Sequence, residues 1–71
     1  MRPQTFREVR RKLEAAGFIQ VSRKGSHVKF VLHTAQGDRT VVVPQHREIQ
    51  VGTLRSITRQ AGLTPEEFER L

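Results

Sequence analysis

The segment from Ser26 to His33 alternates between apolar and polar side chains with a period of two residues. Three apolar residues share one side of this alternation: Val28, Phe30 and Leu32. The residues of the other side are mostly polar or titratable: His27, Lys29, Val31 and His33. Because successive side chains of a strand point to opposite faces, the pattern predicts a strand with one face in a core and one face open. Such a chain must build a sheet and cover only one side of it.

Two further strands are predicted beside this one. From Phe18 to Lys24, β-branched residues alternate with polar ones, and Gly25 permits a tight reversal into the next strand. Thr34 to Asp38 is predicted as a hairpin loop, and Arg39 to Val43 as the third strand. Pro44 closes that strand because it has no N–H to donate to a ladder. The three segments together predict an antiparallel meander.

A helix is predicted from Thr5 to Ala16, before the strands. Its apolar residues recur at spacings of three and four and form one stripe: Phe6, Val9, Leu13 and Ala16. Thr5 with Glu8 has the pattern of a capping box, which satisfies two backbone N–H groups of the first turn. Gly17 suits the left-handed position that follows a last helical turn.

Two more helices are predicted after the strands. Gln45 to Gln50 is polar and basic and is predicted as a surface loop, after which Gly52-Thr53 open a helix that Gly62 ends. The apolar positions of that helix are Leu54, Ile57 and Ala61. Thr64-Pro65 begin a second capping pattern, which predicts a short final helix to Leu71.

The predicted fold is therefore α+β, in the order α-β-β-β-α with a short C-terminal helix, as one domain over residues 1–71. A three-stranded sheet of this kind buries both longer helices on one face. The other face is expected to carry a titratable and cationic row: His27, Lys29, His33 and, as a further candidate, Arg39.

Charge and composition limit the partners. Thirteen Lys and Arg against seven Asp and Glu give a formal charge of +6, which attracts nucleic acid, acidic proteins or anionic membranes. A merely soluble basic domain with none of these partners is the alternative that the charge alone leaves open. The chain has no Cys, so disulfides, thiolate metal sites and a cysteine nucleophile are excluded. No segment approaches the roughly 20 apolar residues of a membrane span, and the expected location is the cytoplasm.

Two stretches resemble a known family, the HicA toxins. Arg23-Lys24-Gly25-Ser26-His27-Val28-Lys29-Phe30 is similar to the strand-turn-strand signature of that family, in which a Gly-Ser-His step begins the second strand. Gly52-Thr53-Leu54-Arg55-Ser56-Ile57, continuing to Leu63, looks like its second-helix signature. The likeness extends over nearly the whole chain. Many relatives have another His or polar residue where this chain has Val28, and Trp where it has Phe18.

The resemblance implies a fold similar to double-stranded-RNA-binding domains and an endoribonuclease activity on messenger RNA that requires no metal. It also implies inhibition by a HicB-type antitoxin. The family's catalytic His matches His27, and RNA cleavage needs such a group to move protons to and from the reacting oxygens. Residues expected to bind phosphate or to let RNA approach are Arg23, Lys24, Gly25, Ser26, Lys29 and His46. His46 is also a candidate for the second proton donor.

Alternatives remain open for these residues. His27 read without the resemblance would more often be a solvated strand residue, and Lys29 is as compatible with a solvated role as with a phosphate contact. The three His residues are irregularly spaced, so no metal site and no cofactor are predicted. A non-catalytic RNA-binding module of the same fold is the main alternative function, and a basic protein-interaction subunit is a weaker one.

Overall fold

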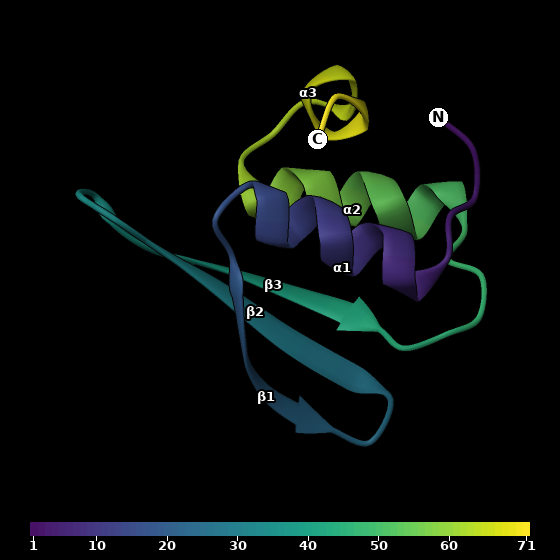
Figure 1. Ribbon diagram of the computed structural model, residues 1–71, viewed down its shortest axis with the longest axis horizontal. Coiled ribbons are helices and arrows are strands. Elements are labelled where there is room, and N and C mark those ends of the chain that lie inside the picture. The colour runs from purple at the N-terminus through teal and green to yellow at the C-terminus, as the bar shows by residue number, and fades with distance from the viewer.

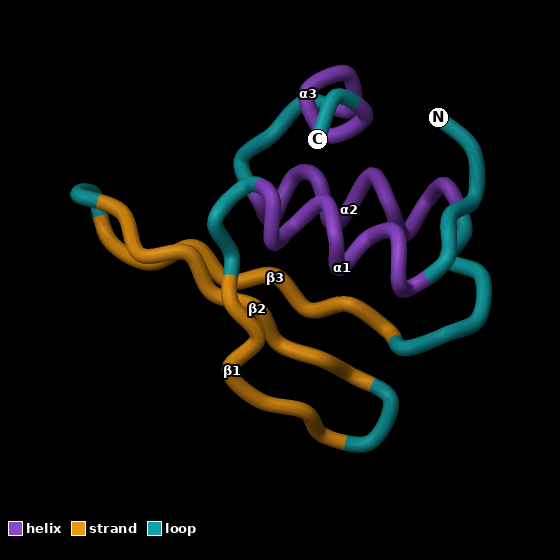
Figure 2. The backbone as a smooth tube through the Cα atoms, in the orientation of Figure 1, coloured by secondary structure: helices purple, strands orange, loops and turns teal.

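The predicted α+β architecture is confirmed by a computed structural model, which describes all residues 1–71. The elements in chain order are α1 (Phe6–Ala15), β1 (Ile19–Lys24), β2 (His27–Thr34), β3 (Gly37–Pro44), α2 (Val51–Ala61) and α3 (Pro65–Glu69). Figures 1 and 2 show α1 and α2 on the same side of the sheet, with α3 above them on the side away from the strands. The hairpin between β2 and β3 extends well past the helices.

Local sequence signals set the helix ends as expected. Thr5 caps α1: its hydroxyl oxygen accepts from the Glu8 N–H at 3.1 Å, and the Glu8 carboxylate accepts from the Thr5 N–H at 3.0 Å. The Thr5 N–H bond to the carboxylate, and after it a hydrogen bond of 3.1 Å that the Thr5 hydroxyl donates to the same carboxylate oxygen, lower the pKa of Glu8. Because the folded pKa lies below the unfolded one, the cap stabilises the fold at neutral pH and loses its effect as the pH falls through the lowered pKa. Thr64 and Glu67 repeat the capping box at α3.

The sheet has the order β1-β2-β3, and both pairings are antiparallel. Register places Val28 opposite Val43 and Phe30 opposite Val41, all four on the face that the helices cover. The buried core joins this face to the helices and consists of Val9, Leu13, Phe18, Val28, Phe30, Val41, Val43, Ile49, Leu54, Ile57, Ala61 and Phe68. The alternation in β2 therefore separates the two faces of the sheet as predicted, except that Val31, on the face away from the helices, is also buried, at 9% exposure.

Three expectations about the segments after β2 are wrong. The segment Thr34–Asp38 is not a five-residue loop, because only Ala35 and Gln36 form the turn and the strands continue on both sides of it. The Thr34 hydroxyl holds this turn: it accepts from the Gln36 N–H and donates to the Gly37 carbonyl. Arg39 lies opposite Leu32, which puts it on the helix-facing side of the sheet and off the open face. Ile49 belongs to the core and not to a polar surface loop.

A buried polar cluster joins the N-terminal segment to α1 and α3. Lys12 of α1 is a charged residue that is only 7% exposed. Its ammonium donates to the Gln4 side-chain carbonyl at 2.9 Å and to Glu69 at 3.4 Å. It also lies 5.1 Å from the centre of the Phe68 ring, a favourable place for a cation. Gln4 in turn forms backbone hydrogen bonds with Ile49 in both directions. The cluster thus anchors both the loop before α2 and the short α3.

Gly62 ends α2 with φ +74, in the left-handed region, and the position that a Cβ would take lies 2.5 Å from Arg39 Cζ. Gly62→Ala is therefore expected to lower the free energy of unfolding by about 1–2 kcal/mol. The matched control is Gly52→Ala inside α2, where a Cβ meets nothing within 4 Å, and a gain of about 0.5–1 kcal/mol is expected. Urea denaturation measures both, and equal stabilities of the two variants would contradict the account.

Candidate functional site

His27 is the first residue of β2 and lies on the open face of the sheet. Its strand neighbours are Lys24 of β1 and Pro44 of β3, and its side chain is exposed. Val28, next along the strand, is 1% exposed on the opposite face and fixes which way β2 is turned. Val28, where many HicA toxins are expected to have a polar residue, therefore packs in the core, and the His27 side chain is accessible to a ligand.

Two ammonium groups share this face with His27. Lys24 is the cross-strand partner of His27, and Lys29 follows two residues along β2, opposite Ser22. Both lysines are exposed, and neither takes part in the two ion pairs of the molecule, Lys12–Glu69 and His33–Asp38. The arrangement places one imidazole between two uncompensated cations, which suits a phosphate group beside a proton-transfer residue.

The turn before His27 is held from two sides. Gly25 has φ +59, and no atom lies within 4 Å of where its Cβ would be, so a ligand can approach the backbone here. Arg23 points away from the lysines by register and donates from Nε to the Gly25 carbonyl at 3.1 Å. The Ser26 carbonyl accepts from the Gln45 N–H. Arg23 and Ser26 thus fix the turn, and the Ser26 hydroxyl makes no hydrogen bond of its own.

His46 does not lie on the open face. It belongs to the loop after β3 and lines a hollow of about 400 Å³ together with the first turn of α1 and its own loop. The other lining residues are Thr5, Phe6, Arg7, Gln45 and Arg47. The sequence places Arg7 on the basic face of the first helix, but it singles out neither Arg47 nor the meeting of Arg7 with His46, because only the fold brings the start of α1 to the end of β3.

The third histidine belongs to a different part of the molecule. His33 Nδ1 lies 2.7 Å from the Asp38 carboxylate, and the two residues face each other across the β2–β3 hairpin. Six residues of strand separate His33 from His27, which is roughly 20 Å. His33 therefore stabilises the hairpin and cannot act with His27 on one phosphodiester.

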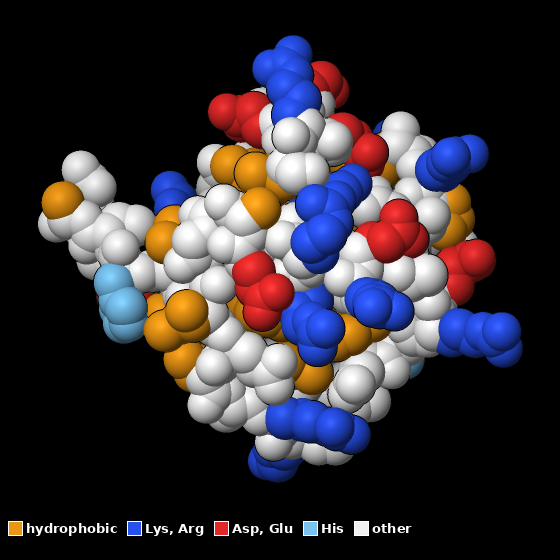
Figure 3. Space-filling model, viewed as in Figure 1, with side chains coloured by type: hydrophobic (Ala, Val, Ile, Leu, Met, Phe, Trp, Pro, Cys, Tyr) orange, Lys and Arg blue, Asp and Glu red, His pale blue; other side chains and the backbone are white.

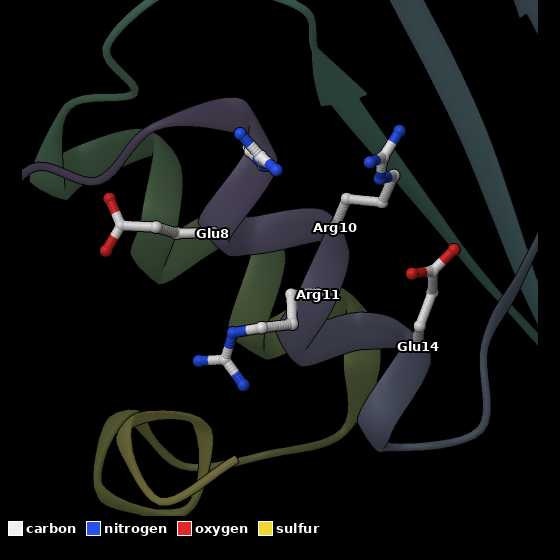
Figure 4. Close-up of a pocket in the computed structure, with 5 residues that line it drawn as sticks. Glu8, Arg10, Arg11 and Glu14 are labelled. Atoms are coloured by element: carbon white, nitrogen blue, oxygen red, sulfur yellow. The ribbon is translucent and has the colours of Figure 1, made fainter.

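A second hollow, of about 350 Å³, lies on the outer side of α1, and all its lining side chains are charged: Arg7, Glu8, Arg10, Arg11 and Glu14. Figure 4 shows Glu8, Arg10, Arg11 and Glu14 projecting outward from the helix, with acidic and basic groups interleaved and no apolar side chain in the lining. This is a solvated helix face. On the face seen in Figure 3, acidic side chains are densest around α3, and Lys and Arg predominate from α1 toward the sheet.

Two further observations concern metals and membranes. No three His, Asp or Glu side chains gather in a way that could hold a metal ion. Among the helices, none has the length and apolar character that crossing a bilayer requires.

Comparison with known proteins agrees with the geometry. No curated protein sequence matches the chain. A family model does match it, over residues 6–63, and its description is HicA toxin of bacterial toxin-antitoxin systems. The match runs from the first residue of α1 to the residue after Gly62, so it covers the sheet, the Gly25–His27 step and the loop with His46. The chain belongs to the HicA toxin family.

Proposed function

We propose that this chain is an endoribonuclease that cleaves messenger RNA without a metal cofactor and so blocks translation. The observation that carries the proposal is the exposed His27 between Lys24 and Lys29, at a turn whose backbone is fixed and open to a ligand. An RNA substrate would place the activity in the cytoplasm. A binding module would need the cations alone, whereas an imidazole between them also provides for proton transfer.

The chemistry follows from these groups. His27 in its neutral form takes the proton of the RNA 2′-hydroxyl, whose oxygen then attacks the adjacent phosphorus. The bond from phosphorus to the 5′-oxygen breaks, and a proton donor supplies that oxygen with its proton. The products are a 2′,3′-cyclic phosphate and a 5′-hydroxyl. Lys24 and Lys29 stabilise the negative charge that develops on the phosphoryl oxygens.

The second proton-transfer group is a separate question. His46 lines the hollow beside α1 and does not share the face of His27, which favours a phosphate contact over proton donation. After proton uptake, His27 itself is a candidate donor, and water is another.

The test uses a defined RNA in the presence of a chelator, with the purified wild-type chain. Cleavage is expected, with 5′-hydroxyl ends, and a matched RNA with 2′-O-methyl groups throughout should remain intact because the nucleophile is blocked. Binding of RNA without cleavage would identify a non-catalytic RNA-binding module. Absence of any salt-dependent RNA binding would leave only a protein-interaction role.

We further propose that a HicB-type antitoxin inhibits the enzyme by covering the open face. Three of the four exposed large hydrophobic side chains of the protein belong to the sheet: Ile19, Val21 and Val42. Ile19 and Val42 lie on the open face by register, opposite Val31 and Lys29, and Val21 is the extra residue of a bulge in β1. An apolar patch beside a cationic row suits a protein partner with acidic side chains around an apolar centre.

Ile19→Lys is the variant that tests this interface. Ile19 is 53% exposed, so folding should be unaffected, but a charge in the apolar patch should weaken antitoxin binding by about tenfold or more. RNA cleavage in the absence of antitoxin should continue. Ala15→Lys adds the same charge on the exposed surface of α1 and is the control. Calorimetry with the cognate antitoxin measures both, and unchanged affinity of Ile19→Lys would place the interface elsewhere.

A further inference from the structure

The hollow between the start of α1 and the loop after β3 has an unusual set of side chains. Three of its six lining residues carry cationic or titratable nitrogen groups, Arg7, His46 and Arg47, and no lining residue is acidic. The three nitrogen-bearing side chains take part in neither ion pair of the molecule. The nearest carboxylates along the chain are engaged elsewhere, since Glu8 caps α1 and Glu48 accepts from the Gln50 amide at 3.2 Å.

The loop that contributes His46 and Arg47 is anchored at both ends. At its start, the Gln45 N–H donates to the Ser26 carbonyl. At its end, Ile49 is 1% exposed and exchanges two backbone hydrogen bonds with Gln4, of 3.1 and 2.7 Å. Gln4 is itself 5% exposed and held by Lys12. The cationic side chains therefore start from a backbone whose position is set by the core, and a ligand would not have to order the loop first.

The hollow is also close to His27 along the surface. Pro44 is the cross-strand partner of His27, with their Cα atoms about 5 Å apart, and the Cα atom of His46, two residues later, lies at most about 7 Å from that of Pro44. The Cα atoms of His27 and His46 therefore lie within about 12 Å of each other. The Gln45–Ser26 hydrogen bond ties the same loop to the turn before His27. A polyanion that places one phosphate at His27 can therefore reach the hollow with a neighbouring phosphate.

We propose that Arg7, His46 and Arg47 form a subsite for a phosphate that flanks the scissile one, on a single strand of RNA. The proposal rests on the endoribonuclease function proposed above and adds a second anchor point to it. Two guanidinium groups supply paired N–H donors for the phosphate oxygens, and the partly buried Phe6 is the one apolar side chain of the lining. The RNA strand then runs from the open face around the end of β3 to the start of α1.

The test measures binding and cleavage separately. Wild type first locates the cleavage site in a short single-stranded RNA. Binding is then measured in the His27→Ala background, with that RNA and with versions in which one phosphate at a time is replaced by an uncharged methylphosphonate. Neutralising one phosphate that flanks the scissile one should lower affinity about tenfold, the scale expected for hydrogen bonds to a charged group. In His27→Ala with Arg7→Ala and Arg47→Ala, the same replacement should change affinity less than about twofold.

The salt dependence gives an independent readout. Loss of one phosphate contact should reduce the slope of log affinity against log salt by about 0.7 for a single strand. Arg70→Ala, at the exposed C-cap of α3, removes a similar charge away from the hollow and should leave the methylphosphonate pattern unchanged.

Two results would overturn the subsite. One is that replacing any flanking phosphate lowers the RNA affinity by the same factor whether Arg7 and Arg47 are present or replaced by Ala. The other is a loss of antitoxin affinity on their removal with no change in the RNA pattern, which would assign the hollow to the protein partner. Absence of cleavage by wild type would count against the ribonuclease proposal instead. The binding scan replaces each phosphate in turn and needs no cleavage, so the failure of the subsite and the failure of the ribonuclease proposal can be told apart.

Discussion

His27→Ala is expected to lower the rate of RNA cleavage by about 10²- to 10⁴-fold, the range that a positioned proton-transfer group contributes. The side chain is exposed and makes no hydrogen bond within the protein, so its removal creates no cavity and leaves no buried group unpaired. Circular dichroism and thermal unfolding should therefore match wild type. Because Lys24 and Lys29 remain on the same face, RNA affinity should change by less than the cleavage rate.

The matched control is His33→Ala, which removes a histidine from the same face of the same strand. His33 is engaged with Asp38 and lies at the far end of β2, so its loss should leave the cleavage rate within about twofold of wild type. Single-turnover cleavage of a defined RNA in chelator compares the two variants. Equal activity of His27→Ala and wild type would point to another catalytic residue, and a comparable loss in both variants would indicate a general effect of the sheet surface.

Sequence alone predicted those parts of the fold whose signals are local. The capping boxes at Thr5 and Thr64 lie within four residues, and the structure contains both. Gly62 follows the last turn of α2 in the left-handed conformation, as its place in the sequence predicts. The alternation in β2 identified the core face because the period of two residues is independent of what the strand packs against.

The wrong predictions have two different causes. Arg39 was a candidate for the open face, but it precedes the buried Val41 and Val43 by two and four residues in the same strand, so it shares their helix-facing side. The burial of Ile49 requires Gln4, which lies 45 residues earlier in the chain. No local pattern in a short polar stretch could reveal that a tail would pair with it.

The candidate site divides in the same way. His27, Lys24 and Lys29 share a strand or a tight turn, so the sequence was sufficient to place them together. Arg23 and Ser26 turned out to hold the turn through a side-chain donor and a backbone carbonyl, roles that depend on the exact path of the chain. The hollow with Arg7 and Arg47 combines residues 40 positions apart, and only the packed structure brings them to one place.

Phe30→Ala is expected to remove about half of the free energy of unfolding of the protein. Phe30 is fully buried at the middle of β2, opposite Gln20 and Val41, and removing a buried ring costs about 3–5 kcal/mol. A domain of 71 residues has only about 4–10 kcal/mol of stability, and this one has no disulfide to add to it. The midpoint of thermal unfolding should fall by roughly 15–30 °C.

Phe6→Ala is the matched control, because Phe6 is only partly buried at the edge of the core and the same truncation should cost clearly less. Thermal unfolding followed by circular dichroism compares the two. Phe30 also fixes the register that turns His27 outward, so Phe30→Ala should weaken the fold, RNA cleavage and antitoxin binding together, whereas His27→Ala should lose cleavage alone. If Phe30→Ala kept a midpoint within a few degrees of wild type, the sheet would have to be held by something other than its helix-covered face.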